Sequence, residues 1–428
     1  MSMTQHFKQK LSAVALGSAI ALASGSASAY NLYNENGSEL NLDIEAVVGT
    51  FSSQENYFGK AGNGSDWQEA YLKAGFSGSH QYNDTTTLYG GLNFVSSGSW
   101  GDGDPAANTD GSERRTAVED AYLGIRSGII DVSAGRQNIT IGDGFLINGD
   151  ALNVGKGTGV PGFAESRGGA YWLAGRKAFD ETFWVKIGGE QGFRSDLFWF
   201  KSDNLMQDNA EMAGINVEYT NDIGTFGVMH LKGLDANQVA ADRKGQTTNS
   251  VRYQGNAGVE NLFLSAELVN QESGSGVDAD AWYAEAGWTF ADVAWSPQLS
   301  YRYTKYDDTF DSLFFGFNRG YGTWFQGEVA ANYAGPFGSS ATIQHVALKA
   351  SPTEMLSVGA LYFDFSDSTT FGSNSEGQEL DIYAEWVVND HLIISPLIGL
   401  YTPDSNNTTQ TSSNDDNLYA QVIAIVPF

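Results

Sequence analysis

Several residue types are scarce or missing in this 428-residue chain. It contains no cysteine, so disulfide bonds and thiolate metal sites are excluded. Lysine and arginine number only 23 against 51 aspartates and glutamates, and the formal charge of −28 excludes nonspecific binding to DNA or to an anionic membrane surface as the main role. Beyond the N-terminal region no apolar run approaches the roughly 18 residues of a transmembrane helix, so any membrane crossing has to use β-strands.

Glycine and aromatic residues, by contrast, are abundant. The chain has 51 glycines, 25 phenylalanines, 20 tyrosines and 10 tryptophans, but only eight prolines. A transmembrane β-barrel has such a composition because alternate residues face lipid while the others face a wet lumen, which keeps the chain hydrophilic overall. The composition therefore favours an all-β membrane fold.

The N-terminal region has the layout of a secretory signal peptide. Lys8 and Lys10 precede the apolar run 11–22, and small residues lead to a cleavage site after Ala29. The run is too short to span a bilayer, and the alternative of a buried core helix is disfavoured because no amphipathic pattern accompanies it. We expect residues 1–29 to be removed and 30–428 to form a single barrel domain. Its formal charge becomes −30, since the leader carries two lysines and no carboxylate.

The last residues, 417–428, predict a strand that ends on an aromatic. One face is wholly apolar, and the other carries Tyr419 and Gln421 together with two isoleucines. A terminal phenylalanine after such a strand is typical of bacterial outer-membrane barrels, and we expect Phe428 to contact the barrel-assembly machinery. The alternative is an edge strand of a soluble sandwich. The apolar face comprises Leu418, Ala420, Val422, Ala424, Val426 and Phe428.

The same alternation recurs along the whole chain. Near the start, Leu40 and Ile44 point one way while Asp43 and Glu45 point the other. Charged residues in mid-strand are costly in a dry core but are tolerated in a water-filled channel. Eighteen segments follow this pattern: 40–51, 67–78, 85–97, 115–126, 130–138, 181–188, 194–202, 211–220, 223–232, 247–257, 260–270, 279–290, 296–306, 341–350, 354–366, 378–389, 391–402 and 416–428.

The connections between these segments alternate between short and long, which predicts a closed antiparallel transmembrane β-barrel of about 18 strands with both termini in the periplasm. Short turns are expected on the periplasmic side, among them 220–222, 256–258, 351–353 and 389–391. Long polar loops are expected on the extracellular side, at 98–113, 138–179, 235–245, 272–278, 306–335, 366–376 and 403–415.

One further segment, 322–333, also alternates. Phe325 and Val329 oppose Trp324 and Glu328 in this stretch. Counting it as a strand makes the total odd, so we interpret it as part of the loop 306–335 and expect that loop to fold into the pore and narrow it. The alternative is a barrel in which one strand has been missed elsewhere.

Two stretches carry a resemblance to a known family. The first is Ala134-Gly135-Arg136-Gln137 followed by Ile141-Gly142-Asp143-Gly144-Phe145, and the second is 310–316 followed by 321–328. They resemble the alginate-export family, within the wider group of substrate-selective outer-membrane porins. The resemblance implies a wide monomeric barrel through which an oligo- or polysaccharide diffuses, typically an anionic one such as alginate. Basic residues line the constriction in that family. Here acidic residues share the lumen with them, namely Glu45, Glu218, Glu267, Glu285, Asp381 and Glu385.

Ten residues are candidates for lining the pore or its constriction. An arginine there can contact a carboxylate or sugar hydroxyl of the solute, or it can pair with a wall carboxylate such as Glu285 or Glu328. An inward tryptophan or tyrosine can stack on a sugar ring, or it can simply fill space. The candidates are Arg126, Arg136, Lys186, Arg252, Arg302, Arg319, Glu285, Glu328, Trp184 and Tyr283.

The sequence predicts no catalytic, cofactor or metal site. The four histidines beyond the leader are scattered, which makes an outer-membrane hydrolase a distant alternative. The acidic stretch 101–113 departs from the calcium-loop template at Pro105 and Ala106, and this leaves either weak surface binding of cations or a merely solvated loop. The glycines of 155–162 lack the strand-to-helix unit of a dinucleotide site.

These observations predict a non-enzymatic channel of the bacterial outer membrane for passive, selective diffusion of small hydrophilic solutes or oligosaccharides. Its expected partners are the lipid bilayer, lipopolysaccharide and the solute, with no nucleic acid, and the barrel is expected to be a monomer. The alternative is a general nonselective, structural or adhesive barrel.

Overall fold

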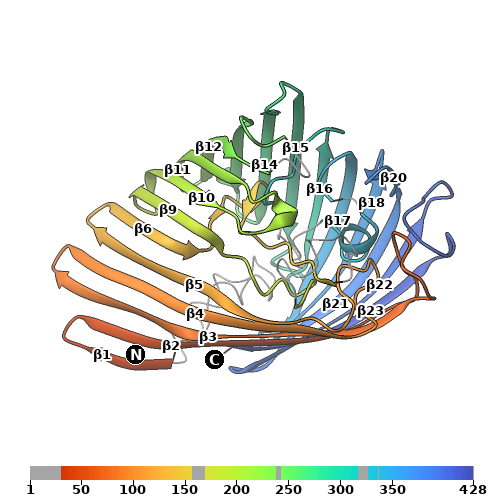
Figure 1. The fold of residues 1–428 in the computed structure, drawn as a ribbon, viewed down its shortest axis with the longest axis horizontal. Helices are drawn as coiled ribbons and strands as arrows, with labels where there is room; N and C mark the ends of the chain where they lie inside the picture. Colours follow the sequence, from red (N-terminus) through yellow and green to blue (C-terminus); the bar gives the residue numbers. More distant parts are fainter. Residues whose placement is uncertain (1–29, 157–168, 238–241, 317–325, 336, 428) are drawn as a thin grey trace.

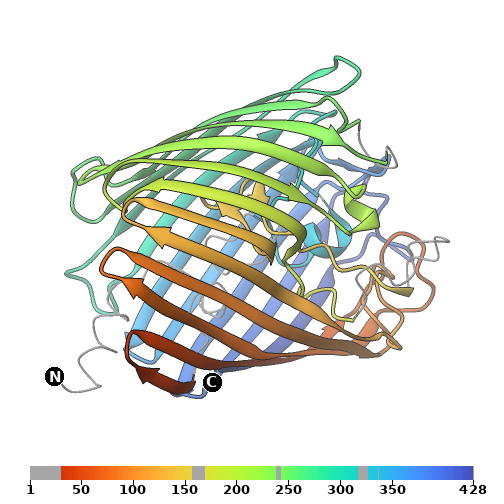
Figure 2. The same cartoon turned by 60° about the vertical axis from the view of Figure 1, so that its left-hand side comes forward.

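The computed structural model describes residues 30–156, 169–237, 242–316, 326–335 and 337–427. Within these ranges one antiparallel sheet of 19 strands dominates the fold. Eighteen of them form a wall that closes on itself, because β2 pairs with β3 on one side and with the last strand, β23, on the other. Figure 2 shows the tilted wall strands lying side by side.

The wall strands are β2 (Ser38–Ser53), β3 (Ser65–Asn83), β4 (Thr86–Gly101), β5 (Arg114–Ser127), β6 (Ile130–Gln137), β9 (Phe179–Gly188), β10 (Gly192–Lys201), β11 (Glu211–Asn221), β12 (Gly224–Asp235), β13 (Thr247–Gly255), β14 (Leu262–Glu272), β15 (Asp278–Thr289), β16 (Gln298–Tyr306), β17 (Ala341–Thr353), β18 (Leu356–Ser366), β21 (Gly377–Asn389), β22 (Leu392–Pro403) and β23 (Asn417–Pro427). Each of the 18 predicted segments coincides with one of them. The predicted closed barrel of about 18 strands is therefore confirmed.

The nineteenth strand, β1 (Tyr30–Glu35), is an addition that the pattern did not predict. It turns back at Asn36 and Gly37, whose positive φ angles of 52° and 72° suit a tight hairpin, and it pairs only with β2. Along the same edge of β2, the pairing with β1 ends at Leu42 and the pairing with β23 begins at Glu45. Thus β1 pairs with the part of this β2 edge that β23 does not reach.

The predicted turn at 351–353 is displaced. β17 continues through Ser351 and Pro352 to Thr353, and the turn consists of Glu354 and Met355. A register irregularity between Ala350 and Thr353 accommodates the proline, which cannot donate a ladder hydrogen bond. The other predicted short turns, 220–222, 256–258 and 389–391, overlap the observed turns 222–223, 256–261 and 390–391, which lie at the same end of the barrel as β1.

Side chains alternate between the two faces of the wall as the sequence predicts. Outward apolar side chains are largely exposed, for example Ile382 (62%), Leu268 (61%) and Val48 (54%), whereas the residues between them are buried inside. A band of exposed apolar side chains on every side suits a protein surrounded by hydrocarbon. Among the described residues no helix is long and apolar enough to cross a membrane.

The described part of 322–333 is not a strand. Residues 326–329 form bends, and Ala330–Ala334 form one helical turn, η3, in which every residue is buried. This agrees with the interpretation of the segment as a loop. Residues 322–325, the signal-peptide segment 1–29, Arg319 and Phe428 lie outside the described residues.

Candidate functional site

Two loops meet inside the barrel. One connects β6 to β9 and contains the short strands β7 (Thr140–Ile141) and β8 (Ile147–Asn148); the other connects β16 to β17. The backbone N–H of Asn148 donates to the carbonyl of Phe314 at 2.8 Å, and the N–H of Phe314 donates to Leu146 at 3.1 Å. The Tyr171 hydroxyl donates to the carbonyl of Asn332 at 2.9 Å. The two loops therefore form one joined body, which we call the inner loops. The first inner loop is the one between β6 and β9, and the second inner loop is the one between β16 and β17.

The inner loops contact widely separated strands of the wall. Phe145 packs edge-on against Tyr283 of β15, with ring centroids 5.0 Å apart. Trp172 contacts Phe51 of β2 at 6.3 Å and Tyr419 of β23 at 6.2 Å. In Figure 1 the segments that follow β6 and β16 run within the ring of strands. The inner loops thus cross the lumen and narrow it.

The prediction that loop 306–335 folds into the pore agrees with this arrangement for the residues described. The sequence pattern placed 138–179 among the outer loops, with no sign that it folds inward. This loop folds inward because it carries apolar side chains that need to be covered. Phe145, Ile147 and Trp172 are buried where the loop packs inside the barrel.

Carboxylates on the wall hold the backbone of the inner loops. Glu379 of β21 accepts hydrogen bonds from the N–H groups of Glu328, Val329 and Ala330 at 2.6, 2.8 and 2.5 Å. Glu119 of β5 accepts from the N–H groups of residues 177 and 178 at 2.6 and 2.8 Å. Such charge-assisted bonds are about twice as strong as neutral ones. Part of the acidic excess of this chain therefore builds the constriction.

Three carboxylates gather where the second inner loop meets β21. Glu328, Glu379 and Asp381 are 3%, 1% and 0% exposed. The carboxyl groups of Asp381 and Glu379 lie within hydrogen-bonding reach of each other. Burial raises the pKa of the Glu328 carboxyl well above its usual value, and the neighbouring charge of Glu379 raises it further. The raised pKa of Glu328 favours the protonated form of this carboxyl, since burial and the neighbouring carboxylate both oppose its ionisation.

A buried ion pair joins the loop after β12 to the second inner loop. The Arg243 guanidinium contacts both oxygens of Asp311, at 2.7 and 2.8 Å. Burial alone raises the pKa of the Asp311 carboxyl, but the charge and hydrogen bonds of Arg243 outweigh it and leave that pKa lowered. This pair fixes the second inner loop from the side opposite β21.

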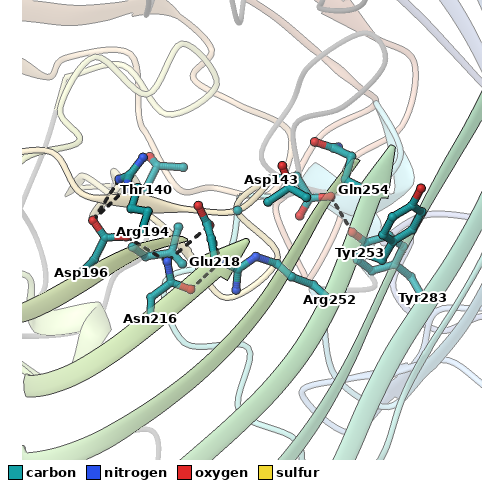
Figure 3. A pocket seen from close by; sticks show the side chains of 13 residues that line it. Thr140, Asp143, Arg194, Asp196, Asn216, Glu218, Arg252, Tyr253, Gln254 and Tyr283 are labelled. Atoms are coloured by element: carbon teal, nitrogen blue, oxygen red, sulfur yellow. Dashed lines mark hydrogen bonds and ion pairs between the residues drawn. The ribbon is translucent and has the colours of Figure 1, made fainter. Parts of the chain in front are cut away.

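A cavity of about 260 Å³ lies between the first inner loop and the wall strands β10 to β15 (Figure 3). Its lining is mainly polar, with three carboxylates and two guanidinium groups. The principal polar residues are Thr140, Asp143, Arg194, Asp196, Asn216, Glu218, Thr225, Arg252, Gln254 and Tyr283. A cavity with donors and acceptors of both signs can hold a small hydroxyl-rich solute.

Four of the five charged groups of this cavity belong to one chain of hydrogen bonds that runs through Asn216. Arg194 donates to Asp196 at 2.9 and 3.2 Å, and Asn216 donates to the same carboxylate at 2.9 Å. Arg252 donates from Nη2 to Glu218 and to Asn216, each at 2.5 Å. Its Nη1 is buried and has no hydrogen-bond partner among the described residues. The side chain of Arg194 is 38% exposed against 7% for Arg252, so Arg194 is the arginine of this cavity that a solute reaches more readily.

The other predicted basic residues are held in place by partners. Arg126 pairs with Asp131 at 2.9 Å close to the turns, and Arg136 pairs with Asp180 and Asp203 at 2.5 and 3.1 Å at the loop end of β6. Arg302 lies 3.6 Å from Glu285. Glu328, the other suggested partner of an arginine, instead lies beside Glu379 and Asp381. The structure brings Arg252 and Tyr283 to the same cavity, but it places the other described candidates elsewhere; Arg319 lies outside the described residues.

The two predicted aromatic residues are covered. The Lys186 ammonium lies 3.8 Å above the Trp184 ring, whose N–H donates to Asp196 at 3.3 Å. Tyr283 is 2% exposed, packs against Phe145 and donates its hydroxyl to Asp143 at 2.6 Å. Neither ring has an open face for a sugar in this structure.

The residues that sequence reasoning missed are those that anchor the inner loops, namely Glu119, Glu379, Arg243 and Asp311. The alternation of side chains along β5 and β21 shows only that Glu119 and Glu379 face the lumen. The neighbouring sequence does not show which loop each of them binds. Among the described residues, no group of three or more histidine, aspartate or glutamate side chains is arranged to hold a metal ion.

No family model matches this chain, and no curated protein matches it. Solved structures do. They include OccK5 (OpdH) from Pseudomonas aeruginosa, with 8% identity, a TM-score of 0.57 and 90% of this chain and 98% of that chain covered. A BenF-like porin from Pseudomonas fluorescens Pf-5 has 11% identity and a TM-score of 0.57 with the same coverage. OccK2 (OpdF) from Pseudomonas aeruginosa, in complex with glucuronate, has 11% identity, a TM-score of 0.52 and again 90% and 98% covered. At these identities the likeness shows the fold, which is that of outer-membrane porins.

Proposed function

We propose that this protein is a channel of the bacterial outer membrane through which small hydrophilic solutes, saccharides among them, diffuse selectively. The observation that carries the proposal is the joined body of the inner loops, which narrows an 18-stranded barrel and leaves a polar cavity beside it. An unobstructed barrel of this size would pass solutes by size alone, whereas a narrowed lumen with placed donors and acceptors can discriminate. We propose no enzymatic activity.

The fold neighbours support a selective channel. One of them holds glucuronate, an acidic sugar, and a ligand of this class has hydroxyl groups for the acceptors of the cavity and a carboxylate for the guanidinium of Arg194, which is 38% exposed. The proposal transfers only the class of ligand, a small polar sugar, to this chain.

The charge balance favours cations and neutral solutes over anions. Most basic side chains near the inner wall have a carboxylate partner, so they offer little free positive charge. The pairs are Lys73–Asp120, Arg126–Asp131, Arg136–Asp180, Arg176–Glu119, Arg194–Asp196, Arg252–Glu218, Arg302–Glu285 and Lys349–Glu385. Glu45, a lumenal carboxylate, has no place in these pairs, and the chain as a whole carries 51 carboxylates against 23 lysines and arginines, which leaves a surplus of negative charge.

Conductance across planar bilayers tests the proposal directly. The purified protein is expected to produce ion-permeable openings, and added saccharides are expected to block the current in the order glucosamine, glucose, glucuronate. An absence of openings contradicts the channel function. Openings that no saccharide blocks favour the alternative of a nonselective or structural barrel.

Export of an anionic polysaccharide such as alginate is the second candidate. The stretches 134–145 and 310–328, which resemble the alginate-export family, favour it. Two features oppose export. The acidic lumen repels a polyanion, and the inner loops would have to be displaced to let a polymer through. Block by alginate oligomers at concentrations where neutral oligosaccharides of equal length have no effect is the result that supports export.

The cellular setting belongs to the same proposal. We infer a bacterial outer-membrane location, reached after removal of the signal peptide 1–29 and with Phe428 contacting the barrel-assembly machinery. The barrel acts as a monomer in contact with phospholipid and lipopolysaccharide. The exposed apolar band around the wall supports this setting.

A further inference from the structure

The outer surface of the barrel carries an apolar groove of about 600 Å³, on the wall formed by β17, β18, β21 and β22. Outward-facing residues of four neighbouring strands form its floor. Ala350 lies opposite Val358, which lies opposite Ala384, and the next row pairs Leu348 with Ala360 and Ala360 with Ile382. The alanines make the floor low, so the groove is a depression in a surface that elsewhere bears large apolar side chains.

The turn between β15 and β16 forms the rim of the groove. Trp295, 60% exposed, lines it together with Ala294 and Pro297. The backbone carbonyl of Trp295 accepts a hydrogen bond from the N–H of Ser351 at 2.9 Å, which ties the turn to the end of β17. Trp295 and Ser296 adopt φ angles of 70° and 43°, a conformation that costs free energy for bulky residues. The turn accepts this strain and thereby holds the indole at the mouth of the groove.

The turns at this end of the barrel are acidic. Of the nine turns that join consecutive strands here, seven carry one carboxylate each, and none carries lysine or arginine. Three of the seven, at Asp292, Glu354 and Asp390, belong to the strands that form or border the groove. The others are Asp84, Glu190, Asp222 and Glu260. Just beyond the apolar wall, the local charge is therefore negative.

We propose that this groove binds one acyl chain of an amine-bearing zwitterionic phospholipid, with the headgroup at the acidic turns. The groove continues the lipid-exposed surface of the barrel, so hydrocarbon is what reaches it, and its lining offers almost no polar partner for water. An unfilled hollow loses dispersion contacts along its lining, and a flexible chain restores them. The carboxylates attract an ammonium group and repel an anionic headgroup.

Native mass spectrometry of the full chain, delipidated in detergent and titrated with palmitoyl-oleoyl phosphatidylethanolamine, tests the proposal. The wild type is expected to retain one lipid under conditions that strip all others. Ala360→Trp combined with Ala384→Trp fills the floor and is expected to weaken this binding about tenfold or more. Ala266→Trp with Ala284→Trp is the matched control, because these outward alanines face each other on β14 and β15 and lie outside the groove.

A second titration tests the headgroup preference of the groove. Phosphatidylglycerol with the same chains is expected to bind at least several-fold more weakly, and Asp292→Asn, Glu354→Gln and Asp390→Asn together are expected to remove the difference. Equal lipid retention by the groove and control variants overturns the proposal. So does a wild-type dimer that the groove variant converts to monomer, because a second copy would then be the occupant. An unchanged headgroup preference after neutralisation overturns the role of the turns.

Discussion

The carboxylate of Glu379 on β21 accepts a hydrogen bond from the backbone N–H of Val329, 2.8 Å away and 50 residues earlier in the chain. The same carboxylate receives the N–H groups on either side of Val329. One wall residue thus fixes the start of the turn η3. The position of the second inner loop, and with it the width of the lumen, depends on this contact.

Glu379→Gln is expected to loosen that loop. The amide keeps only one acceptor oxygen and no charge, so docking of the loop should weaken by about 1–3 kcal/mol. Single-channel recordings should show larger or noisier openings than the wild type. Glu272→Gln, an exposed glutamate at the loop end of β14, is the control and should leave the recordings unchanged. Identical traces for the two variants would exclude an anchoring role for Glu379.

Removal of the second inner loop is expected to raise conductance. Replacing 309–338 by a short glycine-serine linker takes away its contacts with Glu379 and with the first inner loop, and the lumen should widen. Conductance in planar bilayers measures this. Shortening the exposed loop 273–277 controls for loop deletion in general. A deletion variant with wild-type conductance would contradict the role of the second inner loop in narrowing the pore.

The pH dependence of conductance should depend on Glu328. The pKa of this carboxyl is raised above 4.5 when the loop is docked, so docking is most stable at low pH and weakens as rising pH ionises the group. Conductance should therefore increase as the pH rises above about 4.5. Glu328→Gln cannot ionise and should give a flatter profile. A profile that is equally steep in this variant would assign the titration to another group.

Arg252 and Glu218 should behave as one unit. Arg252→Met leaves Glu218 mostly buried beside an apolar side chain, which should cost about 3–5 kcal/mol and lower the thermal unfolding temperature. Adding Glu218→Met removes the orphaned charge and should recover most of that loss. Thermal unfolding in detergent followed by circular dichroism measures both. If the double variant is no more stable than Arg252→Met, the two side chains are not energetically coupled.

The open channel should prefer K⁺ over Cl⁻. A surplus of lumenal carboxylates raises the local concentration of cations, and salt screens this effect because the Debye length falls from about 10 Å at 0.1 M to about 3 Å at 1 M. The reversal potential in a KCl gradient should therefore indicate cation selectivity that weakens as both solutions are made more concentrated. Anion selectivity at low salt would contradict the charge argument and would favour the polyanion alternative.

The wall of the barrel was predictable because the polarity of the side chains in each strand alternates between the lipid-facing and the lumen-facing side. Ile382 and Leu268 face hydrocarbon and Asp381 and Glu267 face the lumen, and a period of two makes this visible from neighbouring residues alone. The count of 18 strands and the placement of most turns follow from that local pattern. β1 was missed because its six residues pair only along one edge of β2, and their alternation is too short to stand out.

The candidate site depended on contacts that no local pattern records. Asp143 meets Tyr283 across 140 residues of sequence, and Glu379 meets Val329 across 50. Alternation shows that Glu379 and Asp381 face inward, but it does not show that Glu328 joins them. By itself, the sequence determined the closed wall with its lipid and lumen faces, since the polarity of each wall residue matches the lipid or water that it contacts. Only the tertiary structure decided which loops fill the lumen and where the outer wall is hollow, because both depend on how distant segments pack together.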